Sequence, residues 1–112
     1  MSWYPVDDGA TLGTGGSEDG VIVRDDEHGL GARITLEEGG GIAPFSITCG
    51  VYGWMVHTRF FSTREEADAA YEAMQADLAA ILARIPNVDD PDADANLHAV
   101  GEIISDFVDR HP

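Results

Sequence analysis

From Phe45 onward, the spacing of apolar residues changes once, from every second residue to every third or fourth. This change constrains the fold more than any other feature. Residues 45–51 and 54–61 alternate between apolar and polar side chains, which is typical of half-buried β-strands. Only Tyr52 and Gly53 separate the two runs, so we predict a hairpin with a two-residue loop. Apolar residues then recur at intervals of three and four, which predicts a helix directly after the second strand.

The predicted helix begins after Ser62 or Thr63, because each hydroxyl is followed three residues later by a glutamate, as in a capping box. Pro86 cannot continue the helix, which therefore ends near residue 85. Its apolar stripe consists of Ala67, Tyr71, Met74, Leu78, Ile81 and Ile85. After an acidic linker (87–96), a second helix is predicted from the helical spacing of Leu97, Val100, Ile104, Phe107 and Val108.

Two further strands are predicted before the hairpin, at 20–26 and 32–38. Four consecutive strands followed by two helices predict a single α+β domain over residues 1–112. Its expected architecture is a four-stranded antiparallel meander with the two C-terminal helices packed on one face of the sheet. Residues 1–19 are rich in glycine and acidic side chains, which predicts turns or a mobile N-terminal arm.

The charge of the chain is strongly negative. Six arginines and no lysine stand against 21 acidic residues, so the net charge is −15. Such a chain repels nucleic acid and anionic membranes, so we expect it to bind neither. The acidity has three candidate explanations: solubility in a salt-adapted host, attraction to a basic protein partner, or mimicry of a nucleic acid.

The single cysteine, Cys49, excludes an internal disulfide and gives no sign of an oxidising compartment. The N-terminal residues do not resemble a secretory signal, and no apolar run approaches the roughly 20 residues needed to span a bilayer. We therefore expect a cytoplasmic location. No motif points to a cofactor, so none is expected.

The predicted hairpin loop fixes which side chains share a face. With Tyr52 and Gly53 as the loop, Cys49 lies opposite Val56 and Thr48 lies opposite His57. Cys49 and His57 then point to opposite sides of the sheet, so they cannot form a Cys–His nucleophilic pair, which requires hydrogen-bond contact. The register predicts that Cys49 is a small buried hydrophobic residue.

The same alternation predicts a cationic, hydroxyl-bearing surface on the sheet face away from the helices. Its candidate binding residues are Arg24, Arg33, Thr48, His57 and Arg59. Such a surface could bind a carboxylate or phosphate through bidentate arginine contacts. It could also be half of a symmetric dimer or a docking face for an acidic peptide. The plainer alternative is a solvated face on which the arginines pair with neighbouring acids.

Two aromatic residues near the N-terminus, Trp3 and Tyr4, either dock on the domain's own core or anchor a partner or a second subunit. His98 and His111 are expected on the surface. The glycines of 13–20 do not form a phosphate loop, because the Lys-Ser/Thr ending is missing.

A calcium site is not predicted in the acidic linker, although Asp90, Asp92 and Asp94 alternate as in an EF-hand loop. Ala95 stands where the loop needs glycine, and Gly101 stands where it needs a bidentate glutamate. No other cluster has metal-ligand spacing, so no metal site is expected.

The absence of a catalytic constellation, together with the surplus of acidic residues, predicts a small non-enzymatic domain. It would act through protein contacts, with a regulatory partner or as a homodimer, and an immunity-type or inhibitor role is one concrete version. The alternative is a binding module or enzyme for a small anion that uses the arginines and His57.

Overall fold

The computed structural model describes residues 3–84 and 93–112, with side chains described for 3–84 and 100–112. The elements follow in the order β1 (Trp3–Pro5), η1 (Val6–Gly9), β2 (Val21–His28), β3 (Ala32–Glu38), β4 (Phe45–Val51), β5 (Met55–Phe61), α1 (Arg64–Leu82) and α2 (Ala93–Arg110). The fold is α+β, as the sequence predicts. Pro86 and most of the acidic linker lie outside the described residues, whereas residues 93–96 belong to α2.

The sheet has five strands and not the predicted four. All neighbours are antiparallel and follow one another in chain order, so the sheet is a meander from β1 to β5. The additional strand, β1, is three residues long and pairs with the end of β2. So short a strand that ends in a proline has no alternation for a sequence pattern to detect.

The chain between β1 and β2 forms turns and folds back on the sheet. After the short helix η1, residues 13–22 make a narrow loop that we call the N-terminal hairpin. Its two arms are joined by bonds from the Gly13 amide to the Ile22 carbonyl (2.8 Å) and from the Ile22 amide to the Thr14 carbonyl (2.9 Å). The predicted turns are present, and they are part of the sheet structure.

The β4–β5 loop has three residues, so the predicted register was wrong by one position. Val51 pairs with Met55, and the Trp54 amide donates to the Val51 carbonyl (2.9 Å). Gly53 adopts a left-handed conformation with φ of 81°. A three-residue loop with glycine at the left-handed position avoids placing Tyr52 in the strained first position of a two-residue turn. Cys49 consequently lies opposite His57 and on the same face.

A second irregularity lies in β2. The pairing of β2 with β3 shifts between Ile22 and Arg24, so Val23 is an extra residue in the strand. The bulge reverses the alternation: Ile22 shares a face with Asp25, whereas Arg24 lies on the face with Asp26. Simple alternation along β2 therefore assigns its first residues to the wrong side.

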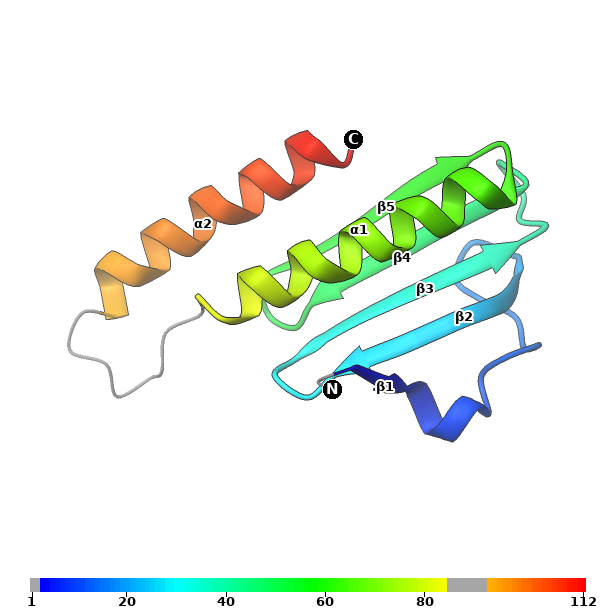
Figure 1. The fold of residues 1–112 in the computed structure, drawn as a ribbon, viewed down its shortest axis with the longest axis horizontal. Coiled ribbons are helices and arrows are strands. Elements are labelled where there is room, and N and C mark those ends of the chain that lie inside the picture. Colours follow the sequence, from blue (N-terminus) through cyan, green and yellow to red (C-terminus); the bar gives the residue numbers. More distant parts are fainter. Residues whose placement is uncertain (1–2, 85–92) are drawn as a thin grey trace.

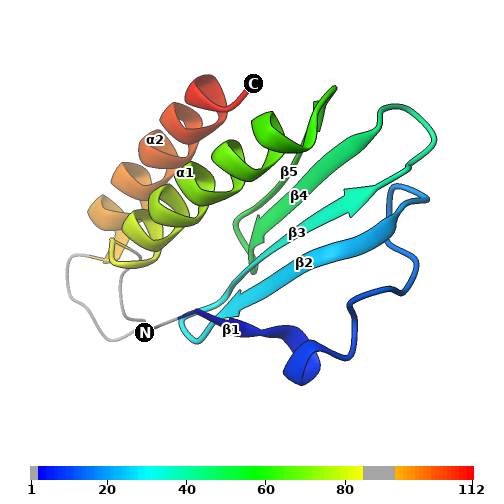
Figure 2. The same ribbon diagram turned by 45° about the vertical axis from the view of Figure 1, so that its right-hand side comes forward.

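Helix α1 lies across one face of the sheet, as Figures 1 and 2 show. Thr63 is its N-cap and accepts a hydrogen bond from the Glu66 amide (3.2 Å), which selects the second of the two predicted caps. The predicted stripe is buried from Ala67 to Ile81 and packs on β3 and β4. Helix α2 runs beside α1, and its Phe107 belongs to the same core and contacts the His57 ring.

We call the face under α1 the helix face and the other the open face. The helix face of the β4–β5 hairpin carries the side chains of the pairs Phe45–Phe61, Ile47–Arg59, Cys49–His57 and Val51–Met55. The open face carries those of Ser46–Phe60, Thr48–Thr58 and Gly50–Val56.

Candidate functional site: the open face and the β5 edge

The predicted cationic surface does not exist as one face. Arg33 and Thr48 lie on the open face, whereas Arg24, His57 and Arg59 lie on the helix face. The bulge in β2 moves Arg24, and the three-residue loop moves His57 and Arg59. The structure therefore separates the five candidate residues into a pair and a group of three.

On the helix face, Arg24 is neutralised by the acidic side of α1. Its guanidinium donates to Glu72 (2.7 Å) and Asp68 (3.4 Å) and stacks 3.9 Å from the centre of the Tyr71 ring. Burial alone would lower the pKa of Arg24, but the hydrogen bond and charge of Glu72 outweigh it and raise this pKa. Arg24 thus ties the sheet to α1.

His57 and Arg59 hold the C-terminal turn that follows α2. The His57 Nε2 atom hydrogen-bonds to the His111 carbonyl oxygen. Arg59 Nη1 lies 3.3 Å from His111 Nδ1, and Arg59 Nε donates to the Pro112 carbonyl (3.2 Å). His111 Nε2 lies 2.7 Å from Asp77 of α1. His111 is buried, so its predicted surface position was wrong.

These contacts leave Cys49 without a catalytic partner among the described residues. Although Cys49 lies opposite His57, the imidazole is engaged with the His111 carbonyl. Burial raises the pKa of the Cys49 thiol to about 12, against the smaller opposing effect of Arg59. A thiol that stays protonated at neutral pH is a poor nucleophile. Cys49 is buried beneath the helices, as predicted, but its cross-strand neighbour is His57 and not Val56.

On the open face, Arg33 is paired with a buried acid. It donates from Nε and Nη2 to the two carboxylate oxygens of Asp25 (2.9 and 2.6 Å), and Thr35 donates to the same carboxylate (2.9 Å). Burial would raise the pKa of Asp25, but the hydrogen bonds, with that of Arg33 foremost, bring this pKa below its ordinary value. The Nε and Nη2 side of the Arg33 guanidinium is therefore occupied by Asp25.

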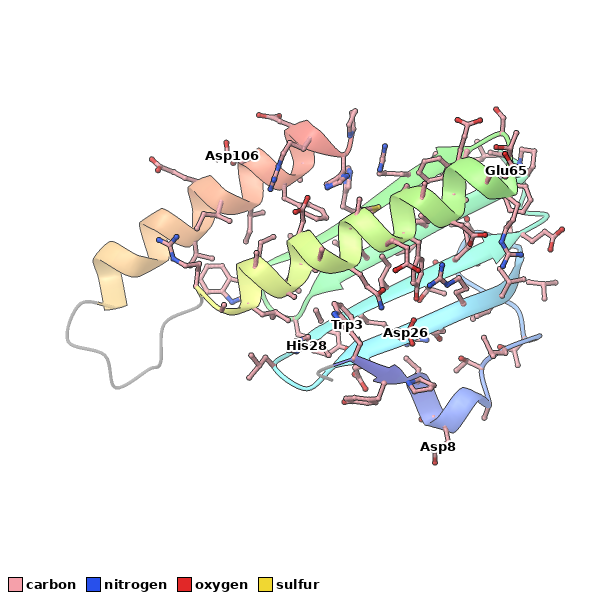
Figure 3. The ribbon with its side chains drawn as sticks, viewed as in Figure 1. Trp3, Asp8, Asp26, His28, Glu65 and Asp106 are labelled. Carbon is pink, nitrogen blue, oxygen red and sulfur yellow. The ribbon has the colours of Figure 1, made fainter. Side chains whose placement is uncertain are left out.

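The two N-terminal aromatics lie at the β1 edge. Trp3 is half-buried, and its ring meets the His28 ring edge-on with centroids 5.1 Å apart (Figure 3). Tyr4 is 46% exposed and donates to Glu27 (3.2 Å), which also accepts a short bond from Tyr52 (2.5 Å). Trp3 docks on its own domain, and no contact tests an anchoring role for either residue.

A shallow groove of about 750 Å³ runs over the open face. It is bounded by the tip of the N-terminal hairpin at one end and by the β4–β5 loop at the other, and Ile22, Thr48, Trp54 and Val56 are among its lining residues. Its apolar rim includes Val56, which is 79% exposed, and Tyr52, which is 54% exposed. Exposed apolar side chains gathered at one place are typical of a surface that binds something.

A buried carboxylate supports one end of this groove. Glu37 is 1% exposed, and its Oε1 accepts hydrogen bonds from the amides of Glu18 (3.0 Å) and Gly20 (3.1 Å). At Gly16, an added Cβ would lie only 2.2 Å from the Glu37 carboxyl carbon, so any larger residue there would displace this carboxylate. Glu37 thereby fastens the N-terminal hairpin over the sheet.

Beside the groove lies the free edge of the sheet, strand β5. Its seven residues pair only with β4 in the described structure. On the open face the strand carries Val56 and Phe60, the latter 43% exposed. Val56 and Phe60 were not predicted as surface residues, because the register of a two-residue loop places both on the buried face, and Tyr52 was predicted only as a loop residue. Gly53, three residues before Val56, was the available sequence signal for the three-residue loop, because this loop needs a left-handed residue there.

Among the described residues, no three histidine, cysteine or acidic side chains are placed to hold a metal ion. None of the described helices is long and apolar enough to cross a bilayer. Comparison of the chain with known protein families, with curated proteins and with solved structures found no match.

Proposed function

We propose that this chain is a non-enzymatic protein-interaction domain that binds a basic protein partner through the open face and the β5 edge. An immunity-type or inhibitor role in the cytoplasm is the concrete form we favour. In this proposal both helices cover the helix face and serve the structure, which leaves the opposite face for the partner.

The observation that carries the proposal is the apolar rim of the groove beside an unpaired edge strand. Val56 and Tyr52 expose apolar area at the rim of the groove, and Phe60 does so further along β5, on a chain whose net charge is −15. Apolar anchors within a charged surround are the usual anatomy of an interface. The surplus of carboxylates favours a basic partner and would speed its association.

The small-anion alternative receives less support from the geometry. Arg24 and Arg33 already pair with carboxylates, and Arg59 is engaged by the C-terminal turn. An anionic ligand would have to compete with these partners for the guanidinium groups. Arg64 and Arg110 are likewise close to Asp68 and Asp77.

Two matched variants test the proposal after a partner has been captured from the source organism and purified. Val56→Asp removes an apolar anchor while adding a charge that a basic partner attracts. Ile42→Asp makes the same change at a residue that is 77% exposed in the β3–β4 loop and does not line the groove. We expect calorimetry to show an affinity loss of about tenfold or more for the first variant and less than about twofold for the second.

The expected affinity also falls as salt concentration rises, because screening weakens the attraction of opposite charges. A captured partner whose affinity is the same for wild type, Val56→Asp and Ile42→Asp would contradict the proposed surface. A partner that is itself acidic would contradict the proposed charge complementarity.

A further inference from the structure

We infer that the partner is bound by strand addition: an extended segment of another protein pairs with β5 and becomes a sixth strand of the sheet. This inference rests on the proposed function for the existence of a partner. It goes further in naming the mode of binding and the chemistry of the bound segment.

The backbone of β5 has donors and acceptors available for such pairing. The Tyr52 amide donates to the Gly31 carbonyl (2.9 Å), so this residue's backbone faces β3. Because backbone groups alternate along a strand, the odd-numbered residues of β4 face β5, and they bond to their partners Met55, His57, Arg59 and Phe61. The amide and carbonyl groups of the residues between them therefore point outward; these residues are Val56, Thr58 and Phe60.

The two edges of the sheet differ in how they are protected. The edge at β1 is only three residues long and ends in Pro5, which has no amide to donate. The edge at β5 is seven residues long and contains no proline, and its one arginine, Arg59, is held on the helix face by the C-terminal turn. Proteins normally shorten, charge or interrupt an exposed edge, and an edge without these features is a template for another strand.

The side chains next to β5 define the segment that would fit. A strand paired with β5 continues the open face, where its alternate residues would contact Val56 and Phe60 and favour apolar side chains. Glu65 lies where β5 leads into α1 (Figure 3), and the chain carries a net charge of −15, which attracts a basic protein. The residues between the apolar ones would lie on the helix face beside His57 and Arg59, so they favour small uncharged side chains. The matching segment is therefore extended, alternates apolar with small polar residues, and has lysine or arginine on either side of the paired stretch.

A second copy of this chain fits the edge less well. Antiparallel pairing of two β5 strands centred on Thr58 would place His57 opposite Arg59 of the other copy, twice. Two molecules of charge −15 would also repel each other. The observations thus favour a basic segment of a different protein.

The test uses a synthetic nine-residue peptide in which five central residues alternate valine with threonine and two arginines flank them at each end, and a matched peptide with glutamate in place of arginine. Each is titrated into the full chain by calorimetry. Thr58→Pro removes one outward amide at an edge position where proline is tolerated, and Thr58→Ala is the control that keeps the amide. We expect the arginine peptide to bind, the glutamate peptide not to bind, and Thr58→Pro alone to weaken binding about tenfold.

Backbone amide exchange by NMR provides a second readout that does not depend on a variant. Adding the arginine peptide to the wild-type protein should slow exchange at Val56, Thr58 and Phe60. Equal binding to Thr58→Pro and the wild type would overturn strand addition, and so would failure of the arginine peptide to bind. Protection that rises with protein concentration alone would overturn it in favour of self-association.

Failure of the inference and failure of the proposed function are distinguishable. If Val56→Asp weakens the binding of a purified partner and Thr58→Pro does not, the proposed surface is supported and strand addition is contradicted. If neither variant changes the affinity, the proposed surface is contradicted as well.

Discussion

Two acidic residues on the open face, Asp25 and Glu37, are buried, and each is stabilised by donors from a different part of the chain. Asp25 is held by Arg33 and Thr35 of β3, whereas Glu37 is held by the amides of Glu18 and Gly20. A buried carboxylate is tolerated only when its oxygens accept hydrogen bonds. Asp25 therefore links β2 to β3, and Glu37 links β3 to the N-terminal hairpin.

Substitution of Glu37 tests the attachment of the N-terminal hairpin. Glu37→Gln removes the charge that strengthens two hydrogen bonds to backbone amides, so we expect chemical denaturation to show a loss of about 1–3 kcal/mol in the free energy of unfolding. Glu38→Gln is the control, because Glu38 is exposed. Its expected change is within about 0.5 kcal/mol. Equal stability of the two variants would mean that the hairpin does not depend on Glu37.

The lowered pKa of Asp25 predicts a pH dependence of stability. A carboxyl whose pKa is lower in the folded state stabilises the fold above its unfolded pKa, and this contribution is lost as the pH falls toward the folded value. In urea denaturation, Asp25→Asn should therefore be clearly less stable than wild type at pH 7. The difference should shrink below about pH 4. Asp8→Asn, at an exposed position, should show no such change between the two pH values.

At the residue scale, alternation along β3 correctly places Glu37 on the face away from the helices. It cannot indicate burial, because the covering hairpin comes from residues that are distant in the chain. Gly15 and Gly16 are the only local sequence sign that the N-terminal hairpin covers Glu37, but glycine-rich sequence is equally typical of an exposed turn.

At the scale of elements, the loop length of the β4–β5 hairpin determines which side chains of β5 lie on the open face. Both the two-residue and the three-residue loop preserve alternation within each strand, and they differ only in which faces of the two strands match. The stripe of α1 and its Thr63 cap could be predicted because their determinants are local in sequence. The register of β5 and the bulge at Val23 could not, because each depends on the conformation of a single residue.

A pair of cysteines tests the register directly. The hydroxyl oxygens of Thr48 and Thr58 lie 3.4 Å apart across the hairpin. In a Cys49→Ala background, Thr48→Cys with Thr58→Cys should form a disulfide on mild oxidation, because directly opposed side chains meet the required separation. Mass spectrometry of alkylated protein measures the free thiols.

The control pairs Thr48→Cys with His57→Cys in the same background. A two-residue loop would place these residues opposite each other, whereas the observed register places them on different faces. A disulfide in the control and none in the first variant would contradict the three-residue loop.

For the molecule as a whole, the proposed function depends on an asymmetry between the two faces and the two edges of the described sheet. Figures 1 and 2 show α1 over one face, and α2 lies on the β5 side of α1. The opposite face carries the groove, and only the β5 edge is long and unprotected. Net charge could be read from composition and led to the proposal of a basic partner, whereas the proposed binding place could be derived only from the three-dimensional arrangement.

The most direct test is residue-resolved amide hydrogen exchange of β5 in the free protein, measured by NMR at low protein concentration. We expect fast exchange at Val56, Thr58 and Phe60, whose amides face outward, and slow exchange at His57 and Arg59, whose amides bond to β4. The reverse pattern would support the two-residue loop, in which Val56 lies on the buried face. Slow exchange at all five positions in the free monomer would contradict the open edge on which the proposed interaction depends.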